Sequence, residues 1–463
     1  MRASGLSPGR RIAGSFRDPS GFVFERDGVL YRQVNSSYRE NYDRLMKSGL
    51  YDKLLEKGWL VAHQETGLPH AATPGAYKVL QPDRIPFISY PYEWCFSQLK
   101  DAALATIRIQ KLAFEHGLTL KDSSAYNIQF VEGRPMLIDT LSFESYQEGE
   151  PWVAYRQYCQ HFLGPLALIA NREFRLSSLL KHHIDGIPVD LASKLLPART
   201  RLKWPLLIHI HLHARSQTKH AGAKVTRSQS KVTRLDFQGL MDSLESGTEA
   251  LHWRAQGDWA QYYSETNYSE PAFERKKELV SEFLQQSGAA EVWDLGANVG
   301  LFSRLAAGQG KPTLSMDLDP ASVEANYLEC RKSGRTQIMP LLIDLVNPSP
   351  SLGWASRKRD SLIERGPTDL AMALALIHHL VIANNVPLLD AAKFFAKLCR
   401  ALLIEFVPKQ DSQVQRLLAS RVDIFDDYTQ QGFERAFEQC FTLERTEKIT
   451  GTQRVLYLMR TRC

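Results

Sequence analysis

The residues with the clearest chemical potential are three aspartates, Asp294, Asp317 and Asp344, each of which follows a short apolar run. Asp317 stands 23 residues after Asp294, which is the spacing at which a ribose-binding carboxylate follows a nucleotide-binding turn. Three acids in the same position after successive apolar runs are hard to explain as solvated surface charge. They predict a ligand-binding site that is lined by acidic side chains.

The turn that begins at Asp294 reads DLGANVG, with Gly296, Asn298 and Gly300 in alternate positions. Gly296 would let the backbone approach a ligand, and Gly300 would let the next helix pack closely on the strand. Asn298 stands where glycine is more common, but asparagine is one of the few other residues that tolerate a positive φ. Taken by itself, the stretch could also be an ordinary strand–helix turn.

The apolar pattern around these residues predicts a doubly wound α/β domain in the second half of the chain. A helix is expected over 272–288, ending at a glycine. Short strands then alternate with helices: strands 291–295, 312–317, 338–344, 369–377 and 401–407, and helices 299–308, 320–333 and 387–399. Ligands of such sheets bind at the edge where the carboxyl ends of the strands meet, so the three aspartates would face one ligand.

Acids gathered at this edge favour a positively charged ligand over a dinucleotide, because carboxylates repel a pyrophosphate. They suit a molecule that carries ribose hydroxyls, an adenine amine and a cationic centre. S-adenosylmethionine has all three.

Residues 290–407 resemble class I S-adenosylmethionine-dependent methyltransferases through the stretches VWDLGANVG, MDLDP, LLIDL and DLAMALALIHHL. The resemblance implies a Rossmann-like, doubly wound sheet of seven strands. The cofactor-binding residues that it implies are Asp294, Gly296, Asn298, Gly300, Asp317, Asp319 and Asp344. The first two would hold the methionine part of the cofactor, Asp317 with Asp319 nearby would bind the ribose, and Asp344 would bind the adenine amine.

A general base is needed for methyl transfer only if the acceptor must lose a proton, since positioning supplies most of the catalysis. The candidates at the sheet edge are His378, His379 and Glu405. The two histidines could instead form a wall of the cofactor pocket, and Glu405 could be an ordinary charge at a strand end.

An aromatic stretch precedes the predicted domain and contains Trp253, Trp259, Tyr262, Tyr263 and Tyr268. In the methyltransferase family a lid over the cofactor often comes from this place, and Tyr263, Tyr268 and Lys276 would be its contacts. A helix that packs on the sheet is the alternative interpretation.

The first half contains Asp122, Asn127 five residues later, and Asp139 after a short predicted hairpin. A second hairpin is expected over 20–34, and helices are expected near 40–57 and 95–117. The pattern resembles the catalytic loop and metal-binding segment of protein-kinase-like folds, in which the first Asp orients the hydroxyl and the other two residues hold magnesium.

Several residues depart from the kinase pattern. Leu120 stands where a histidine is expected, Thr140 and Leu141 replace the Phe-Gly pair, and only Arg32 is available where the strand lysine should be. No glycine-rich phosphate loop precedes the first hairpin. We therefore expect a degenerate kinase-like α+β domain, with a simple hairpin and loop acids as the alternative.

A basic stretch separates the two halves. Residues 191–235 contain ten Lys or Arg, four His and no Asp or Glu. We expect a kinase-like domain over 1–214, a basic linker over 215–240 and the methyltransferase domain over 241–463. Within the stretch, His209, His211 and His213 alternate as on one face of a strand, a spacing that seldom closes a metal site. An edge or interface strand is the favoured interpretation, and no metal site is predicted.

Composition sets broad limits. The chain has 463 residues, 44% hydrophobic and 23% charged, with a formal net charge of +6. These values are typical of a soluble globular protein of two or three domains, and the charge is too small to indicate nucleic-acid binding. The six cysteines are scattered without a C-x-x-C pair, which suits a reducing cytoplasm. No signal peptide and no apolar run long enough to span a bilayer are visible, so we expect a cytoplasmic protein without a membrane partner.

The sequence as a whole predicts methyl transfer from S-adenosylmethionine to an acceptor, with a small molecule favoured. An RNA or protein methyltransferase that uses the basic segment as a substrate arm is a second possibility. A third is a non-catalytic, cofactor-binding scaffold whose kinase-like half recruits a partner. The oligomeric state is not predicted.

Overall fold

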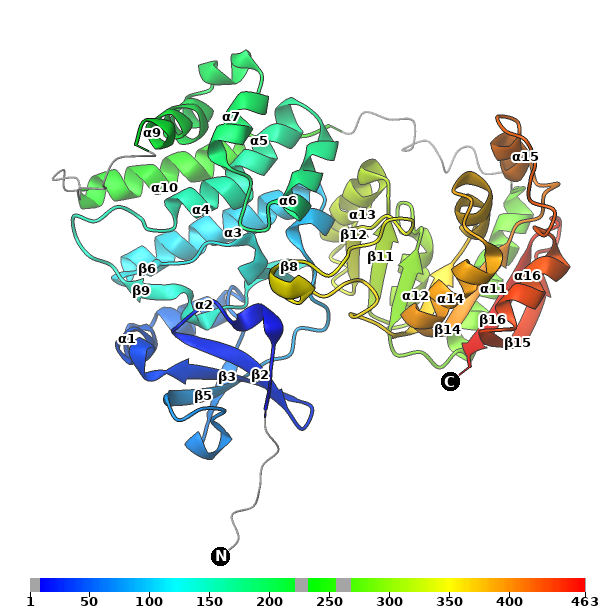
Figure 1. The fold of residues 1–463 in the computed structure, drawn as a ribbon, viewed down its shortest axis with the longest axis horizontal. Helices are drawn as coiled ribbons and strands as arrows, with labels where there is room; N and C mark the ends of the chain where they lie inside the picture. The colour runs from blue at the N-terminus through cyan, green and yellow to red at the C-terminus, as the bar shows by residue number, and fades with distance from the viewer. Residues whose placement is uncertain (1–8, 221–231, 255–267, 463) are drawn as a thin grey trace, which may run out of the picture. The chain divides into compact units, whose positions relative to one another are not determined.

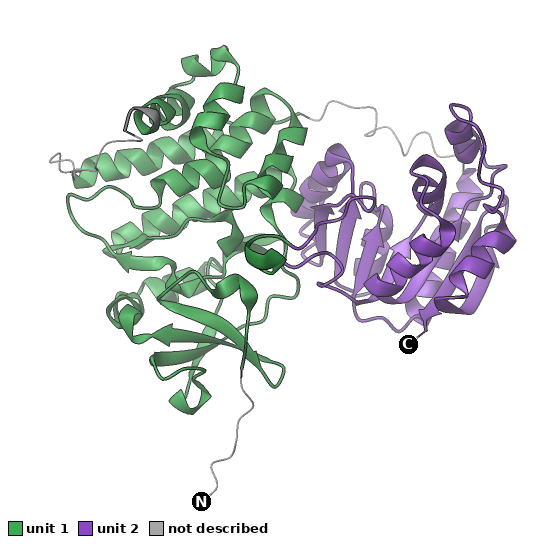
Figure 2. Ribbon diagram, viewed as in Figure 1, with its two compact units in different colours: residues 1–254, 352–359 green, residues 255–351, 360–463 purple. Residues whose placement is uncertain are grey.

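The computed structural model describes residues 9–220, 232–254 and 268–462 (Figure 1). Contacts within the chain divide it into two compact units (Figure 2). Unit 1 comprises residues 1–254 together with 352–359, and unit 2 comprises 255–351 and 360–463.

Unit 1 begins with a five-stranded antiparallel sheet in the order β1-β2-β3-β5-β4. Its elements are β1 (Arg10–Arg11), β2 (Gly21–Arg26), β3 (Val29–Asn35), α1 (Arg39–Lys47), α2 (Leu50–Glu56), β4 (His63–Thr66) and β5 (Ala76–Pro82). The predicted hairpin over 20–34 is confirmed as β2 and β3, with Asp27 and Gly28 at positive φ in the turn. A small core of Val34, Tyr38 and Leu80 lies beneath this sheet.

The remainder of unit 1 is mainly helical. Its elements are α3 (Phe96–Glu115), β6 (Leu118–Leu120), β7 (Ile128–Val131), β8 (Arg134–Leu137), β9 (Phe143–Ser145), α4 (Tyr155–Tyr158), α5 (Gly164–Asn171), α6 (Leu179–His182), α7 (Val189–Leu195), α8 (Trp204–Leu206), α9 (His213–His220) and α10 (Arg234–Glu249). The β7–β8 hairpin lies between Asp122 and Asp139, and β6 pairs with β9 around it. This order of sheet, helix, loop acid, hairpin and second acid gives the α+β, kinase-like fold that the resemblance implied.

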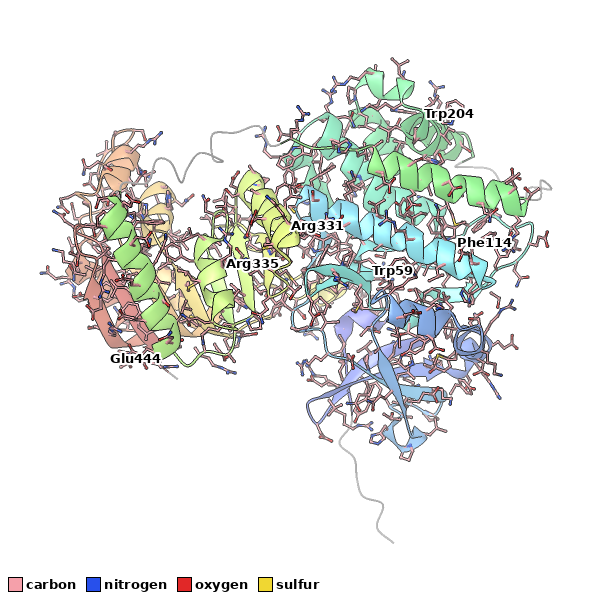
Figure 3. The ribbon with its side chains drawn as sticks, turned by 180° about the vertical axis from the view of Figure 1, so that it is seen from behind. Trp59, Phe114, Trp204, Arg331, Arg335 and Glu444 are labelled. Carbon is pink, nitrogen blue, oxygen red and sulfur yellow. The ribbon has the colours of Figure 1, made fainter. Side chains whose placement is uncertain are left out.

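Helix α10 places the boundary of unit 1 later than the predicted linker over 215–240. Thr233 and Asp236 form a capping box at its start, with Asp236 N donating to Thr233 Oγ1 at 3.1 Å. Phe237 of α10 stacks on Phe114 of α3 at a centroid distance of 4.6 Å, and Glu245 accepts from Arg108 Nε at 2.8 Å. Phe114 is labelled in Figure 3. The helix is thus packed into unit 1, and contacts divide the chain between 254 and 255.

The prediction of a histidine strand at 209–213 is wrong. Residues Leu207–Leu212 form a π-helical turn that continues into α9. His209 lies 2.9 Å from both Tyr155 Oη and Ser243 Oγ, and His211 lies 2.9 Å from Ser193 Oγ. Alternation in the sequence suggested a strand, but these side chains are buried helix residues with hydroxyl partners.

Unit 2 is built on a seven-stranded sheet in the order β12-β11-β10-β13-β14-β16-β15. Its strands are β10 (Val292–Leu295), β11 (Thr313–Asp317), β12 (Ile338–Leu342), β13 (Thr368–Ala373), β14 (Cys399–Phe406), β15 (Phe441–Lys448) and β16 (Val455–Thr461). The strands β10 to β14 are parallel, and β16 is antiparallel to both of its neighbours. The helices are α11 (Glu270–Gln286), α12 (Leu301–Gly308), α13 (Pro320–Ser333), α14 (Leu388–Leu398), α15 (Ser412–Leu418) and α16 (Gln430–Phe437).

Helices cover the faces of this sheet, as the predicted doubly wound arrangement requires (Figure 1). Val280 and Phe283 of α11 pack with Met372 and Leu403 of the central strands in one buried core. The expected strand 369–377 is shorter than predicted, because β13 ends at Ala373 and the chain turns at Ala375, which has a φ of 51°. Among the described residues, no helix has the length and apolar character needed to cross a membrane.

Candidate functional site

The turn after β10 has the backbone conformation that its residues predicted. Gly296, Asn298 and Gly300 all have positive φ, at 77°, 50° and 77°. A Cβ atom on Gly300 would lie about 2.4 Å from the side chain of Asn326 on α13. Glycine at 300 therefore lets α12 begin directly against α13, whereas Asn298 is one of the residue types that accept the left-handed region.

Asp317, at the end of β11, holds this turn in place. Its Oδ2 accepts a hydrogen bond from Asn298 N at 2.7 Å, and its Oδ1 accepts from Asp319 N at 2.8 Å. Burial raises the pKa of the Asp317 carboxyl, against the opposing effect of these backbone amides. The carboxylate thus joins the ends of two adjacent strands and lines the pocket between them.

Asp319, predicted to lie near the ribose of the cofactor, also caps a helix. Its carboxylate caps α13, accepting from Ser322 N at 2.9 Å and from Ser322 Oγ at 2.6 Å. It also lines the pocket, but its hydrogen-bonding capacity is directed to the helix N-terminus.

Asp294 is the most enclosed acid of the set, with 2% of its surface exposed. Ser303 Oγ donates to its Oδ2 at 2.6 Å. Burial, with a smaller contribution from the charge of Asp317, raises the pKa of Asp294 to about 6. A buried carboxylate with a raised pKa has a strong electrostatic reason to bind a cationic ligand.

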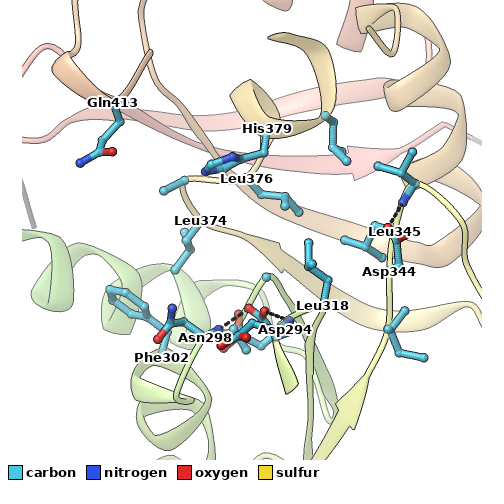
Figure 4. A pocket seen from close by; sticks show the side chains of 18 of the residues that line it. Asp294, Asn298, Phe302, Leu318, Asp344, Leu345, Leu374, Leu376, His379 and Gln413 are labelled. Atoms are coloured by element: carbon cyan, nitrogen blue, oxygen red, sulfur yellow. Dashed lines mark hydrogen bonds between the residues drawn. The ribbon is translucent and has the colours of Figure 1, made fainter. Parts of the chain in front are cut away.

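One cavity of about 370 Å³ collects the predicted cofactor residues at the carboxyl edge of the sheet (Figure 4). Asp344 lines it from the end of β12, with its Oδ1 accepting from Val346 N at 2.9 Å. In the view of Figure 4, His379 lies across the pocket from Asp294 and Asn298. From the predicted set, the lining contains Asp294, Gly296, Asn298, Asp317, Asp319, Asp344 and Tyr268, but not Gly300.

The two histidines that follow β13 differ in their access to the pocket. His379 lines the pocket, and burial lowers its pKa, so its imidazole is neutral near pH 7. His378 is 1% exposed and does not line the pocket, although its ring centroid lies 4.2 Å from that of His379. Of these two histidines, only His379 therefore lines the pocket.

Glu405 lies outside the pocket lining and is fully buried in an ion network. Its Oε2 accepts from Lys276 Nζ at 2.6 Å, and its Oε1 lies 3.3 Å from Arg454 Nη1 and also accepts from the Tyr268 hydroxyl. Burial opposes ionisation of this carboxyl, but the charges of Lys276 and Arg454 outweigh it and lower its pKa to about 2. Such a group is too weak a base to accept a proton near pH 7.

Tyr268 and Lys276 both line the pocket, and Lys276 belongs to α11, a helix that packs on the sheet. Tyr263 and the neighbouring Trp259 and Tyr262 lie outside the described residues. Two lining residues from the end of the chain, Gln413 and Arg454, were not predicted. Arg454 immediately precedes β16, and no element was predicted beyond residue 407, so nothing in the sequence placed this side chain at the sheet edge.

The kinase-like residues of unit 1 are brought together, but one acid already has a cationic partner. Arg32 of β3 forms an ion pair with Asp139, whose carboxylate also accepts from Leu141 N and Ser142 Oγ. Burial and the nearby charge of Asp139 raise the pKa of Asp122. The guanidinium of Arg32 thus pairs with the carboxylate at the position where a kinase binds magnesium.

The antiparallel strand β16 inserted beside β14, the glycine turn and the acids on three adjacent strands define unit 2 as a class I S-adenosylmethionine-dependent methyltransferase fold. In this chain it is joined to a kinase-like unit. More particularly, the chain belongs to the family of the nodulation protein NoeA of Rhizobium meliloti (strain 1021). The two are 34% identical over 467 residues, which cover 98% of this chain and 97% of that protein. No protein-family model matches the chain.

Solved structures show more distant similarity. The bifunctional kinase-methyltransferase WbdD matches with a TM-score of 0.29 and 15% identity, over 44% of this chain and 46% of WbdD, less than half of its length. The N-methyltransferase NodS from Bradyrhizobium japonicum WM9, in complex with S-adenosyl-L-homocysteine, matches with a TM-score of 0.32 and 14% identity, over 44% of this chain and 93% of NodS. Magnesium protoporphyrin IX methyltransferase (ChlM) from Synechocystis PCC 6803, with bound SAH, matches with a TM-score of 0.32 and 16% identity, over 44% of this chain and 93% of ChlM.

Proposed function

We propose that unit 2 transfers the methyl group of S-adenosylmethionine to a small-molecule acceptor. The observation that carries the proposal is the convergence of Asp294, Asp317 and Asp344, from three adjacent strands, on one cavity. When bound, the cofactor supplies an electrophilic methyl group on a sulfonium.

The pocket fits the three parts of that cofactor. Asp294 is the buried acid suited to the cationic methionine end, and Asp317 lies between the glycine turn and β11, where it can accept from ribose hydroxyls. Asp344 is more exposed, at the far strand, where its carboxylate can accept from the adenine amine. Apolar side chains such as Leu318 and Ile343 complete the lining.

A small and largely uncharged acceptor is favoured over a nucleic acid at this site. The two cations in the described lining, Lys276 and Arg454, both bond to Glu405. Around His379 the pocket wall is formed by Leu376, Leu380 and Asn384, which offer apolar and amide contacts. Such a wall lacks the free positive charge that binds a phosphate backbone.

Titration calorimetry with S-adenosylmethionine tests cofactor binding, and labelled-methyl transfer to a fractionated cell extract tests the acceptor class. Binding together with label in the metabolite fraction is the expected result. Label in RNA or protein would replace the acceptor with a macromolecule, and binding without any transfer would favour a cofactor-binding scaffold. Absence of binding would reject all of these versions.

Cofactor affinity should depend on pH through Asp294. Because its pKa is raised to about 6, the carboxyl is protonated in more acidic solution and loses its attraction for a cation. We expect the association constant for S-adenosylmethionine to fall roughly tenfold per pH unit well below pH 6, as expected when binding requires loss of one proton. Calorimetry from pH 5 to pH 8 should show this decline in the wild type. Asp294→Asn should bind weakly with no comparable pH dependence, and a wild-type profile that is flat would contradict the assignment.

Replacement of His379 should affect turnover more than binding. The neutral imidazole can accept a proton from an acceptor hydroxyl or amine, and general-base catalysis contributes typically about 10²–10⁴-fold. His379→Gln should therefore lower kcat by roughly 100-fold or more, with cofactor affinity nearly unchanged. His378→Gln is the matched control, since that side chain is outside the pocket. An equal loss of kcat in both variants would argue against a base at 379.

Unit 1 should not respond to Mg-ATP. The ion pair between Arg32 and Asp139 satisfies the acid that would hold magnesium. We expect no rise in the thermal unfolding temperature when Mg-ATP is added to the full chain, whereas S-adenosylmethionine should raise it. A Mg-dependent shift with ATP would contradict the view that this half is a degenerate kinase.

A further inference from the structure

Two strongly exposed apolar side chains of unit 1 lie close together in its basic stretch. Leu202 is 89% exposed and Trp204 is 68% exposed (Figure 3). Arg201 and Lys203 alternate with them and are exposed as well. We refer to these four consecutive residues as the 201–204 patch.

The patch is held on an ordered support. It spans the end of a 3-10 helix, Ala198–Leu202, and the start of α8. Thr200 and Leu206 on either side are buried, and Thr200 Oγ1 donates to Pro197 O at 2.6 Å. The residues on both sides of the patch are therefore packed into unit 1, while Leu202 and Trp204 remain exposed to water. Two large apolar side chains presented in this way indicate a binding surface.

The surroundings of the patch are positively charged. Lys203 Nζ donates to Asn171 Oδ1 and Arg199 Nη2 donates to Asn171 O, both at 3.0 Å, and Arg172 Nε donates to Leu195 O at 2.9 Å. These acceptors are neutral, so they fix the side chains without cancelling their charge. The acids close by in the sequence, Glu173 and Asp190, are paired with Arg175 and Lys194.

We propose that the 201–204 patch binds the surface of an anionic phospholipid bilayer. The cations of Arg172, Arg199, Arg201 and Lys203 would meet lipid phosphates, and Leu202 and Trp204 would enter the layer between headgroups and acyl chains. Tryptophan favours that layer because its ring is apolar and its indole N–H can remain hydrogen-bonded. This surface attachment is independent of the methyltransferase site and revises the expectation that the chain has no membrane partner.

A lipid surface accounts for the apolar residues better than RNA does. Single-stranded nucleic acid binds to successive aromatic rings beside a basic groove, and the patch has one aromatic residue. Leu202 is the most exposed apolar side chain recorded for the described residues, and it has no ring on which a base could stack. Its transfer into an apolar layer, by contrast, is favourable.

Sedimentation of the full chain with vesicles tests the proposal. We expect binding to vesicles of phosphatidylcholine with phosphatidylglycerol, little binding to phosphatidylcholine alone, and a decrease as salt is raised. Arg201→Glu with Lys203→Glu should weaken binding roughly tenfold or more, because each cation near the surface contributes several-fold in affinity. Leu202→Ser with Trp204→Ser should weaken it at every salt concentration, including high salt.

Matched controls are available in unit 2. Val422 and Ile424 are 80% and 65% exposed, so Val422→Ser with Ile424→Ser removes similar apolar surface elsewhere. Lys332→Glu with Arg335→Glu changes the net charge by the same amount as the patch variant. Retained binding by both controls supports the patch. Failure of the wild type to bind acidic vesicles, equal losses in the controls, or binding to poly-uridine RNA in place of vesicles would overturn the proposal.

Discussion

Asp317→Ala should lower the affinity for S-adenosylmethionine by roughly 100-fold or more, because each hydrogen bond to a charged group contributes about 1.5–3 kcal/mol. The variant would lack the carboxylate that we propose accepts hydrogen bonds from the ribose of the cofactor. It would also release Asn298 N, to which it is joined at 2.7 Å, and thereby loosen the turn that approaches the ligand. Calorimetry on the purified variant measures the loss, and far-ultraviolet circular dichroism checks that the sheet is intact.

Asp319→Ala is the matched control for this prediction. The two acids are two residues apart and line the same pocket, but Asp319 caps α13 through Ser322. Loss of the cap should reduce the stability of the protein by about 1 kcal/mol, with only a small change in cofactor affinity. If Asp319→Ala reduced affinity as much as Asp317→Ala, the ribose contact would have to be reassigned. Full affinity in Asp317→Ala would remove Asp317 from the site.

The cofactor side of the pocket could be predicted from the sequence because its chemistry is local. Asp294, Asp317 and Asp344 each follow the strand that positions them, and parallel strands bring their carboxyl ends to one edge. The positive φ of Asn298 follows from its residue type and its place in a tight turn. Short apolar strands and the turns behind them thus carry most of the information for this half of the site.

The ion network beside the pocket depends on contacts between distant residues, which single-sequence patterns do not show. Arg454 reaches the pocket only because β16 runs antiparallel beside β14, and Glu405 is buried because Lys276 and Arg454 approach it from other elements. The alternation of His209 and His211 was misleading for a related reason. The hydroxyl partners of these histidines, Ser193 of α7 and Ser243 of α10, are distant in the sequence. The packing of the segment against those helices is therefore not visible in its own residue pattern.

Glu405 should prove to be a residue that stabilises unit 2 rather than a catalytic base. Glu405→Gln removes the negative charge that two buried cations face, and breaking a buried ion pair from one side costs about 3–5 kcal/mol of folding free energy. Chemical denaturation followed by circular dichroism would measure this loss. Cofactor binding, measured at a temperature where the variant is folded, should be far less affected than stability.

Unfolding by acid gives a second measure of how much the Glu405 carboxylate stabilises the protein. The folded-state pKa of Glu405, about 2, is below its ordinary value of 4.5, so the unfolded chain binds the proton more readily than the folded one. The stabilisation is therefore complete above about pH 4.5 and is lost as the pH falls toward 2. The wild type should lose more stability over that interval than Glu405→Gln, whose side chain at 405 does not titrate.

A double variant separates the structural role from a catalytic one. Lys276→Met combined with Glu405→Gln removes the ammonium along with the carboxylate, and Arg454 keeps its bonds to Asp411 at 2.7 and 3.1 Å. If Glu405 acts by neutralising Lys276, the double variant should be more stable than Glu405→Gln, because no ammonium is left buried without its partner. If Glu405 were the base, turnover would be abolished in both variants while stability barely changed, and removal of Lys276 would rescue nothing. The stability difference between the single and double variants therefore decides between the two roles.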